Sequence, residues 1–359
     1  MSSTKKQFPS SLLHVLKTHN GPVNVVCFSN LTGTYILTGS SDRSVHLTRA
    51  VPANSSRSQT VQTTTSPIQK YNEHAYSVLD LAVSADNARF ASVGGDKKVF
   101  LWDVERGTTL RRWIGHEGRV EAVEFGGVDD SVVVSGSADS TVKIWDARSQ
   151  STKPIQTFTE ARDTVSSLHV HTATATIVSG SYDGRVRSYD LRMGRTTTDI
   201  LCVTGGGAVT SVRCSDDGQA ILASCLDSKI RMMDRSNGSV LRGFGGTSTS
   251  ATLLTSLNPA SGTAPRTSGP IAAYRNDSLR IRSTFAMGDS VVISGGESSS
   301  EEKQDEEGRV FAWDVLTGSM VASIAMGPSI KVASSVAWNE SGQSWAAGCS
   351  DGSVQVVGR

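Results

Sequence analysis

One short pattern recurs seven times along this 359-residue chain. Each copy opens with an acidic residue, has valine or isoleucine three positions later, and closes three positions after that with a residue that is tryptophan in three copies. The opening residues are Asp42, Asp96, Asp139, Asp183, Asp227, Glu307 and Asp351, and the closing residues are Thr48, Trp102, Trp145, Tyr189, Met233, Trp313 and Val357. Successive opening residues lie 54, 43, 44, 44, 80 and 44 positions apart. A chain that repeats at a nearly constant period folds as an array of similar units that pack on their neighbours.

Each unit is predicted to be a small antiparallel sheet. Segments such as SVVVSGSAD (131–139) and TVKIWDARS (141–149) alternate apolar and polar residues, as strands do, and glycine and aspartate turns separate them. No helical periodicity intervenes, and a period near 44 residues is typical of a propeller blade. The sequence therefore predicts an all-β fold, a seven-bladed β-propeller.

The two ends of the chain predict how the ring closes. The last copy, CSDGSVQVVGR, stops after its third strand and leaves the seventh blade one strand short. We expect residues 11–17 (SLLHVLK) to supply the missing strand. Residues 1–359 would then form a single propeller domain whose seventh blade has no open edge.

Three polar segments are expected to be loop insertions. Residues 51–69 separate blades 1 and 2, residues 245–270 lie in the gap of 80 residues, and residues 297–307 (ESSSEEKQDEE) fall within blade 6. We expect no eighth blade in the gap, because it contains one strand pair and no further acidic turn. For the acidic segment, the alternatives to a solvated loop are a docking strip for a basic partner and a phosphorylation cluster at Ser298–Ser300.

The string GHEGRVEAVEF followed by SGSADSTVKIWD resembles the WD-repeat signature of a glycine-histidine pair, two strands, a turn aspartate and a Trp-Asp end. The resemblance implies a buried hydrogen-bond relay in each complete blade. The relay residues would be His116, Ser135, Asp139 and Trp145 in blade 3, His74, Ser92, Asp96 and Trp102 in blade 2, and in part His19, Thr38 and Asp42 in blade 1. Because a hydrolase needs its Ser-His-Asp triad only once, this recurrence indicates a structural role. Blades 4 and 5, which lack the histidine, are expected to rely more on apolar packing.

Composition argues against several classes of function. The 35 basic and 34 acidic residues leave a net charge of +1, so we expect no direct binding to nucleic acid or membranes. The segment MSSTKKQFPSSLLHVLKTHN has too short an apolar run for a signal peptide or an anchor. The histidines lack metal-ligand spacing, and His171 is expected to face solvent. We therefore expect a protein that is not an enzyme, binds no cofactor and keeps its five cysteines reduced in an intracellular core.

Longer strings point to one group of WD-repeat proteins. EHAYSVLDLA, GGDKKVFLWDV, EARDTVSSLHV and SYDGRVRSYDLRMG resemble the mitogen-activated protein kinase organizer family. The compact pattern of that family lacks the polar insertions between blades 1 and 2 and between blades 5 and 6. The resemblance implies a scaffold that holds kinases of one cascade together, is also linked to the spliceosome, and occurs in cytoplasm and nucleus. We expect a monomer that joins larger protein complexes. The candidate partner-binding residues, just before a blade's first strand, are Tyr76, Arg119, Arg162 and Thr164.

The sequence also allows two other functions. Trp145-Asp-Ala-Arg148 and Tyr189-Asp-Leu-Arg192 end consecutive blades and resemble the double motif of substrate receptors for cullin-type ubiquitin ligases. Arg148 and Arg192 could then pair with an acidic adaptor, although either could pair locally with an aspartate instead. The third hypothesis is a purely structural subunit of a ribonucleoprotein complex, with any RNA association carried by neighbouring proteins.

Overall fold

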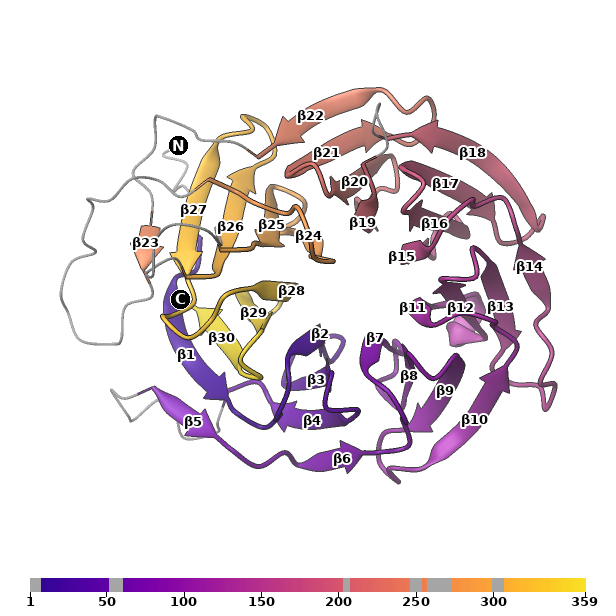
Figure 1. Cartoon of the computed structure of the whole chain (residues 1–359), viewed down its shortest axis with the longest axis horizontal. Coiled ribbons are helices and arrows are strands. Elements are labelled where there is room, and N and C mark those ends of the chain that lie inside the picture. Colours follow the sequence, from indigo (N-terminus) through magenta and orange to yellow (C-terminus); the bar gives the residue numbers. More distant parts are fainter. Residues whose placement is uncertain (1–7, 52–60, 203–206, 246–253, 257–272, 299–306) are drawn as a thin grey trace.

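The computed structural model describes residues 8–51, 61–202, 207–245, 254–256, 273–298 and 307–359. These residues form seven sheets, arranged as blades of one ring (Figure 1). The predicted seven-bladed β-propeller is therefore confirmed. Among the described residues, no helix is long and apolar enough to cross a membrane.

Blades 1 to 5 have four strands each. Blade 1 consists of β2 (Val23–Phe28), β3 (Tyr35–Ser40), β4 (Val45–Arg49) and β6 (Gln69–Tyr71). Blade 2 consists of β7 (Val78–Val83), β8 (Arg89–Gly94), β9 (Lys98–Asp103) and β10 (Thr109–Ile114). Blade 3 consists of β11 (Val120–Gly126), β12 (Val132–Ser137), β13 (Val142–Asp146) and β14 (Gln156–Phe158), with the short 3-10 helix η2 (Val128–Asp130) after β11. Blade 4 consists of β15 (Val165–His171), β16 (Thr176–Ser181), β17 (Arg185–Asp190) and β18 (Arg195–Leu201). Blade 5 consists of β19 (Val209–Cys214), β20 (Ala220–Cys225), β21 (Lys229–Asp234) and β22 (Val240–Phe244).

Blades 6 and 7 have five strands each. Blade 6 consists of β24 (Ser283–Ala286), β25 (Val291–Gly295), β26 (Arg309–Asp314), β27 (Met320–Ala325) and β23 (Leu254–Ser256). Blade 7 consists of β28 (Ala333–Asn339), β29 (Ser344–Cys349), β30 (Val354–Gly358), β1 (Ser11–Leu16) and β5 (Gln62–Thr64). In both blades the fifth strand is added in parallel to the outer edge.

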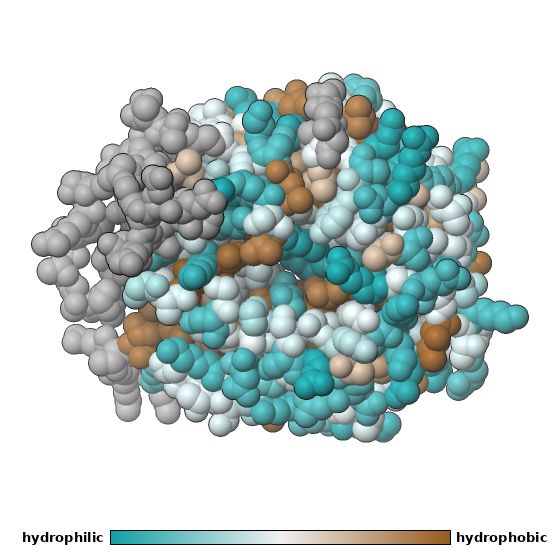
Figure 2. Space-filling view, in the orientation of Figure 1, coloured by the Kyte–Doolittle hydropathy of each residue, from teal (hydrophilic) through white to brown (hydrophobic). Residues whose placement is uncertain are grey.

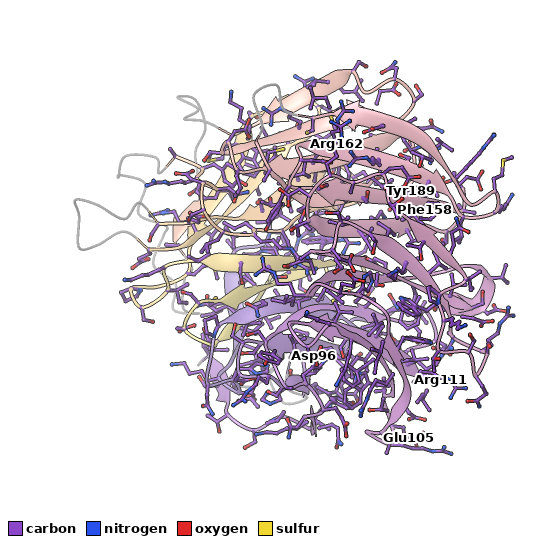
Figure 3. All side chains as sticks on the ribbon, turned by 45° about the vertical axis from the view of Figure 1, so that its right-hand side comes forward. Asp96, Glu105, Arg111, Phe158, Arg162 and Tyr189 are labelled. Carbon is purple, nitrogen blue, oxygen red and sulfur yellow. The ribbon has the colours of Figure 1, made fainter. Side chains whose placement is uncertain are left out.

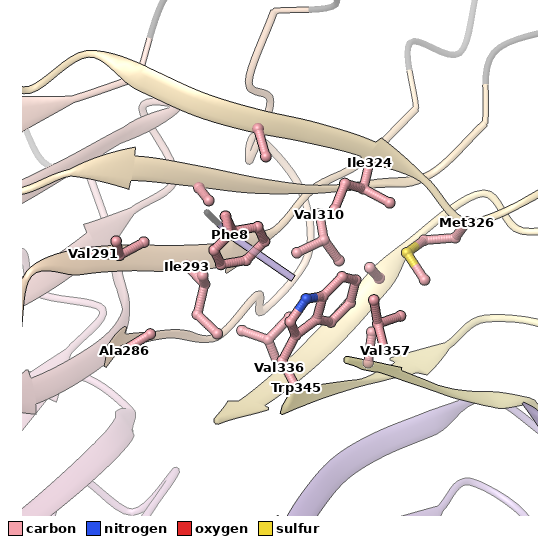
Figure 4. Packing of buried hydrophobic residues seen from close by; sticks show 14 of the residues in the cluster. Phe8, Ala286, Val291, Ile293, Val310, Ile324, Met326, Val336, Trp345 and Val357 are labelled. Atoms are coloured by element: carbon pink, nitrogen blue, oxygen red, sulfur yellow. The ribbon is translucent and has the colours of Figure 1, made fainter. Parts of the chain in front are cut away.

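The two chain ends meet in blade 7. β1 pairs antiparallel with β30, placing Ser11 opposite Gly358 and Leu16 opposite Val354. Just before β1, Phe8 packs among apolar side chains of blades 6 and 7 and stacks on Trp345, with ring centroids 6.2 Å apart (Figure 4). The Trp345 indole N–H also donates to the Pro9 carbonyl at 3.0 Å. The N-terminal segment thus completes blade 7 and fills the boundary with blade 6.

The polar insertions contain more strand than the sequence indicates. Within residues 51–69, which were expected to be a loop, β5 pairs with β1, and Gln69 begins β6. Within residues 245–270, β23 pairs with β27. The loop interpretation is wrong at these positions because backbone hydrogen bonds to an open strand edge require no apolar side chains. In the acidic segment, Glu297 bridges to Val332, whereas residues 299–306 and most of the predicted docking or phosphorylation segment lie outside the described residues.

Adjacent blades pack through glycines that leave room for a neighbouring valine. A Cβ atom on Gly136 of β12 would lie 2.6 Å from a methyl carbon of Val165 in the next blade. The same boundary is filled farther out by Phe158 and Tyr189, whose ring centroids are 4.4 Å apart (Figure 3). Because these contacts recur around the ring, each blade holds its neighbour at a fixed angle.

Candidate functional site: the blade relays and the two faces of the ring

In blade 3, four side chains from separate segments form one continuous relay. The Trp145 indole N–H donates to Ser135 Oγ at 2.8 Å, the Ser135 hydroxyl lies 2.8 Å from His116 Nε2, and His116 Nδ1 lies 2.9 Å from Asp139 Oδ2. Since Ser135 accepts from the indole, its own proton goes to Nε2, and His116 donates through Nδ1 to the carboxylate. Burial disfavours the charged carboxylate, but the hydrogen bonds from His116 and Thr141 hold the Asp139 pKa below its ordinary value.

Blade 2 repeats this arrangement with nearly the same distances. His74 Nδ1 lies 2.8 Å from Asp96 Oδ2, His74 Nε2 lies 2.7 Å from Ser92 Oγ, and the Trp102 indole donates to Ser92 at 2.8 Å. Ser92 has no exposed surface. A hydroxyl buried in this way cannot reach a substrate, so the arrangement anchors the turn of the blade to its core.

Blade 1 carries a relay without tryptophan. His19 bonds to Asp42 at 2.9 Å and to Thr38 at 2.8 Å, and its ring stacks on that of His46 with centroids 3.9 Å apart. Burial and the charge of His19 lower the pKa of His46 to about 4. His46 is therefore neutral at neutral pH, where it stacks on His19.

In blades 4 and 5 an arginine takes the place of the histidine. Arg187 is almost fully buried and its Nη2 donates to Asp183 at 2.8 Å, while Arg231 Nη1 donates to Asp227 at 3.1 Å. The expectation that these blades, lacking the histidine, rely more on apolar packing is therefore wrong. Each arginine lies four positions after its turn aspartate and returns along the third strand to the carboxylate. That spacing is the sequence signal that could have identified both pairs.

A group of ion pairs joins blades on different sides of the central channel. These pairs were not predicted from the sequence. Arg282 Nη1 lies 2.7 Å from Asp80 Oδ1, and Arg280 Nη1 lies 3.3 Å from Glu121 Oε2, so blade 6 is tied to blades 2 and 3. Between blades 5 and 3, Arg213 Nη1 on β19 donates to Glu124 on β11 at 2.8 Å. Charged residues inside otherwise apolar first strands, as in VLDLAV and VEAVEF, were the available signal.

The structure also corrects the expectation for His171. It was expected to face solvent, but its residual exposure is 9% and its ring bonds to the Thr174 hydroxyl at 2.8 Å and the Asp216 carbonyl at 3.1 Å. His169 lies two positions earlier on the same strand, and its Nδ1 is 2.8 Å from Arg213 Nη1. Packing of blade 5 against blade 4 covers the strand end that a single blade would expose.

Three of the four predicted partner-binding residues are accessible on one face of the ring. We call this the aspartate face, because the turns that carry Asp96, Asp139 and Asp183 lie there. Tyr76 is 62% exposed, and Arg119 and Arg162 are also exposed.

Each of these three residues lies beside one of those turns. The Arg162 backbone N–H donates to Asp183 at 3.0 Å, and the Arg119 carbonyl accepts from Ala138 at 2.9 Å. The fourth residue, Thr164, is 8% exposed and lies at the base of its loop, so it does not belong to this surface.

Arg148 and Arg192 lie on the other face of the ring. Both follow the third strand of a blade, at the end remote from the turn aspartates, and both are exposed. Their backbone N–H groups donate to Asp146 at 2.8 Å and Asp190 at 2.7 Å. The structure thus separates two predicted binding sets: one on the aspartate face and one on the opposite face. Figure 2 shows a face of the ring that is mostly hydrophilic, with small hydrophobic patches near its centre.

Comparison with known proteins agrees with this architecture. A model of the nucleolar protein 10-like N-terminal domain, a β-propeller, matches residues 68–267, and a model of the WD domain, G-beta repeat, matches residues 10–48. Rat WD repeat domain-containing protein 83 is 35% identical over 324 residues, which cover 90% of this chain and 85% of that protein. Its Dictyostelium discoideum homologue is 26% identical over 338 residues, 87% of each chain.

A second similarity covers a shorter part of the chain. Human DDB1- and CUL4-associated factor 5 is 36% identical over 130 residues, which cover 36% of this chain but 13% of that much longer protein. The similarity that extends along almost the whole chain is therefore to the shorter WD-repeat proteins. The chain belongs to the WD-repeat family, as a homologue of WD repeat domain-containing protein 83.

Proposed function

We propose that this protein is an interaction scaffold that holds components of a mitogen-activated protein kinase cascade near one another. The observation that carries the proposal is the 35% identity to rat WD repeat domain-containing protein 83 along 90% of the chain. It adds to the resemblance of SYDGRVRSYDLRMG and its neighbouring strings to the kinase organizer family. Such a protein contributes no chemistry, because its effect is to raise the concentration of one partner near another.

The ring suits this role physically. Its blades are locked by buried relays and by ion pairs across the channel, so its surface loops keep fixed positions. Tyr76, Arg119 and Arg162 place an aromatic ring and two guanidinium groups on the aspartate face. These side chains are enriched at the energetic centres of protein interfaces. We propose that at least one kinase-cascade component binds there.

A link to the spliceosome is part of the same proposal. The protein would then work in both cytoplasm and nucleus, and it would join nuclear complexes through protein contacts. The net charge of +1 favours contacts with proteins over contacts with RNA. A purely structural subunit of a ribonucleoprotein would share these nuclear contacts, but kinase signalling would not depend on it.

A second candidate function is favoured by one observation. Arg148 and Arg192 are exposed at equivalent positions of adjacent blades, and the factor whose name refers to DDB1 and CUL4 is similar over 130 residues. A ligase adaptor with an acidic surface could pair with both guanidinium groups. This proposal predicts a partner on the face opposite to the one proposed for kinases.

Affinity capture of variants separates these candidates. The tagged protein would be isolated from its own cells with and without RNase, and bound proteins identified by mass spectrometry. Tyr76→Ala with Arg162→Ala tests the aspartate face, Arg148→Ala with Arg192→Ala tests the opposite face, and Arg106→Ala, an exposed arginine after the third strand of blade 2, is the control.

Each outcome assigns a function. We expect the aspartate-face pair to lose kinase-cascade proteins and the control to keep them. RNase-resistant splicing factors would support the nuclear link. Loss of a ligase adaptor in the Arg148 and Arg192 pair would support the receptor, whereas kinase-cascade proteins absent from every sample would contradict the kinase scaffold.

A further inference from the structure

Two of the five cysteines meet at the boundary between blades 4 and 5. Cys202 directly follows β18, and Cys225 is the last residue of β20. Their Sγ atoms lie 3.6 Å apart, within one buried cluster that also contains Val186 and Val209. The sulfur atoms are therefore in contact although they come from different blades, and both thiols are free in this structure.

The two thiols differ in access and in environment. Cys202 is 7% exposed, whereas Cys225 has no exposed surface. The hydrogen-bond contact between the two sulfur atoms holds the pKa of Cys202 below its ordinary value. The charge of the Arg231 guanidinium favours the Cys202 thiolate, whereas the Asp227 carboxylate that it binds opposes it. The outer cysteine is thus the better nucleophile and the inner one is placed to react second.

The other three cysteines have the opposite character. Burial raises the pKa to about 12 for Cys27, about 11 for Cys214 and about 12 for Cys349. None of the three has a second sulfur among its hydrogen-bond contacts in the described residues. These thiols are expected to stay inert under conditions in which the Cys202 and Cys225 pair reacts.

We propose that Cys202 and Cys225 form an oxidative modification site, at which a peroxide converts the two thiols to a disulfide that joins blade 4 to blade 5. In the first step the Cys202 thiolate attacks the peroxide: an S–O bond forms, the O–O bond breaks, and the leaving hydroxide takes up a proton to become water. In the second step the Cys225 sulfur attacks the sulfenic acid: the S–S bond forms, the S–O bond breaks, and the departing oxygen leaves as water with the Cys225 proton. Two thiols lose two electrons in total, and hydrogen peroxide is reduced to two waters.

The consequence of this reaction is a covalent bond between neighbouring blades. The boundary between blades 4 and 5 is otherwise held by noncovalent packing, and Arg162 of the aspartate face lies in the loop that leads into blade 4. A disulfide closes the chain between residues 202 and 225 and restricts the unfolded state, so it raises the resistance of this part of the ring to unfolding. A dithiol reductant reverses the reaction.

Peptide mapping of the full-length protein tests the proposal. The folded, reduced protein would be treated with hydrogen peroxide, and remaining thiols would be alkylated in denaturant. Trypsin places Cys202 in peptide 196–213 and Cys225 in peptide 214–229, which also contains Cys214. The mapping would therefore be done on the wild type and on a Cys214→Ser background, with Cys202→Ser and Cys225→Ser as the variants that lack one partner.

We expect titratable thiols to fall from five to three per chain in the wild type and from four to two on the Cys214→Ser background, with peptides 196–213 and 214–229 linked in both. The link should be absent in both single variants and should disappear with a dithiol. Five thiols remaining after treatment, over-oxidation of Cys202 without a link, or links that involve only other cysteines would overturn the proposal. Fragmentation of the linked wild-type peptides between Cys214 and Cys225 identifies the bonded cysteine, so the test stands even if a serine variant folds poorly.

Discussion

Replacing Asp139 with alanine tests the structural reading of the relay. Asp139 accepts four hydrogen bonds, from His116 Nδ1 at 2.9 Å, the Glu117 backbone at 2.9 Å, and the backbone and hydroxyl of Thr141 at 3.0 and 2.6 Å. The His116 side chain has no exposed surface, so its N–H loses the carboxylate and keeps only a longer contact of 3.3 Å with the Thr141 hydroxyl. A buried donor that loses its acceptor costs about 1–3 kcal/mol, whereas the other donors lie near the surface and can bond to water.

The assay is denaturant unfolding followed by tryptophan fluorescence. We expect Asp139→Ala to lower the free energy of unfolding by that amount, and Glu117→Ala, which removes an exposed carboxylate from the same loop, to change it by less than about 0.5 kcal/mol. An unchanged midpoint for Asp139→Ala would refute the relay as a source of stability.

The same variant should alter the response to acid. Because the folded-state pKa of Asp139 is depressed, its carboxylate stabilises the fold above the unfolded-state pKa of about 4, and this contribution is lost as the pH falls further. The difference between wild type and Asp139→Ala should therefore be full at neutral pH and shrink in acid. A difference that stays constant down to strong acid would contradict this sign.

Three further substitutions have expected outcomes. Arg187→Ala should destabilise blade 4 by about 2–4 kcal/mol in denaturant unfolding, because Asp183 loses a buried cation but keeps two backbone donors; no change would mean that the pair is dispensable. Gly136→Ala should lower the free energy of unfolding by about 1–3 kcal/mol, because the new methyl group clashes with Val165. Gly243→Ala, which has open space around it, should leave that free energy unchanged. Since His46 has a folded-state pKa of about 4, stability should fall as the pH drops from about 6.5 towards 4, and His46→Phe should remove that part of the profile.

The sequence predicts the parts of this fold that each blade specifies for itself. The turn aspartate, the alternating strands and the closing tryptophan all lie within one period, so seven copies at a period near 44 residues predicted the propeller. Ring closure also followed, because blade 7 lacked a strand that residues 11–17 could provide. The structure ends that strand at Leu16.

Features that depend on contacts between distant blades could not be predicted in this way. Arg280 meets Glu121 across 159 positions, and Cys202 meets Cys225 across a blade boundary. β23 is held by backbone hydrogen bonds to an edge, which leave no apolar pattern to read. Thr164 was assigned to the surface because it precedes a first strand, but only 8% of the residue is exposed.

The most direct test of the scaffold is whether two partners bind one molecule at the same time. In a two-step capture, the tagged protein would be isolated first, and complexes in the eluate would then be isolated through one mitogen-activated cascade kinase. We predict that a second component of the cascade is recovered in the final eluate together with this protein, and that Tyr76→Ala with Arg162→Ala reduces its recovery. A final eluate that contains the first kinase and this protein, but never a second cascade component, would contradict the scaffold.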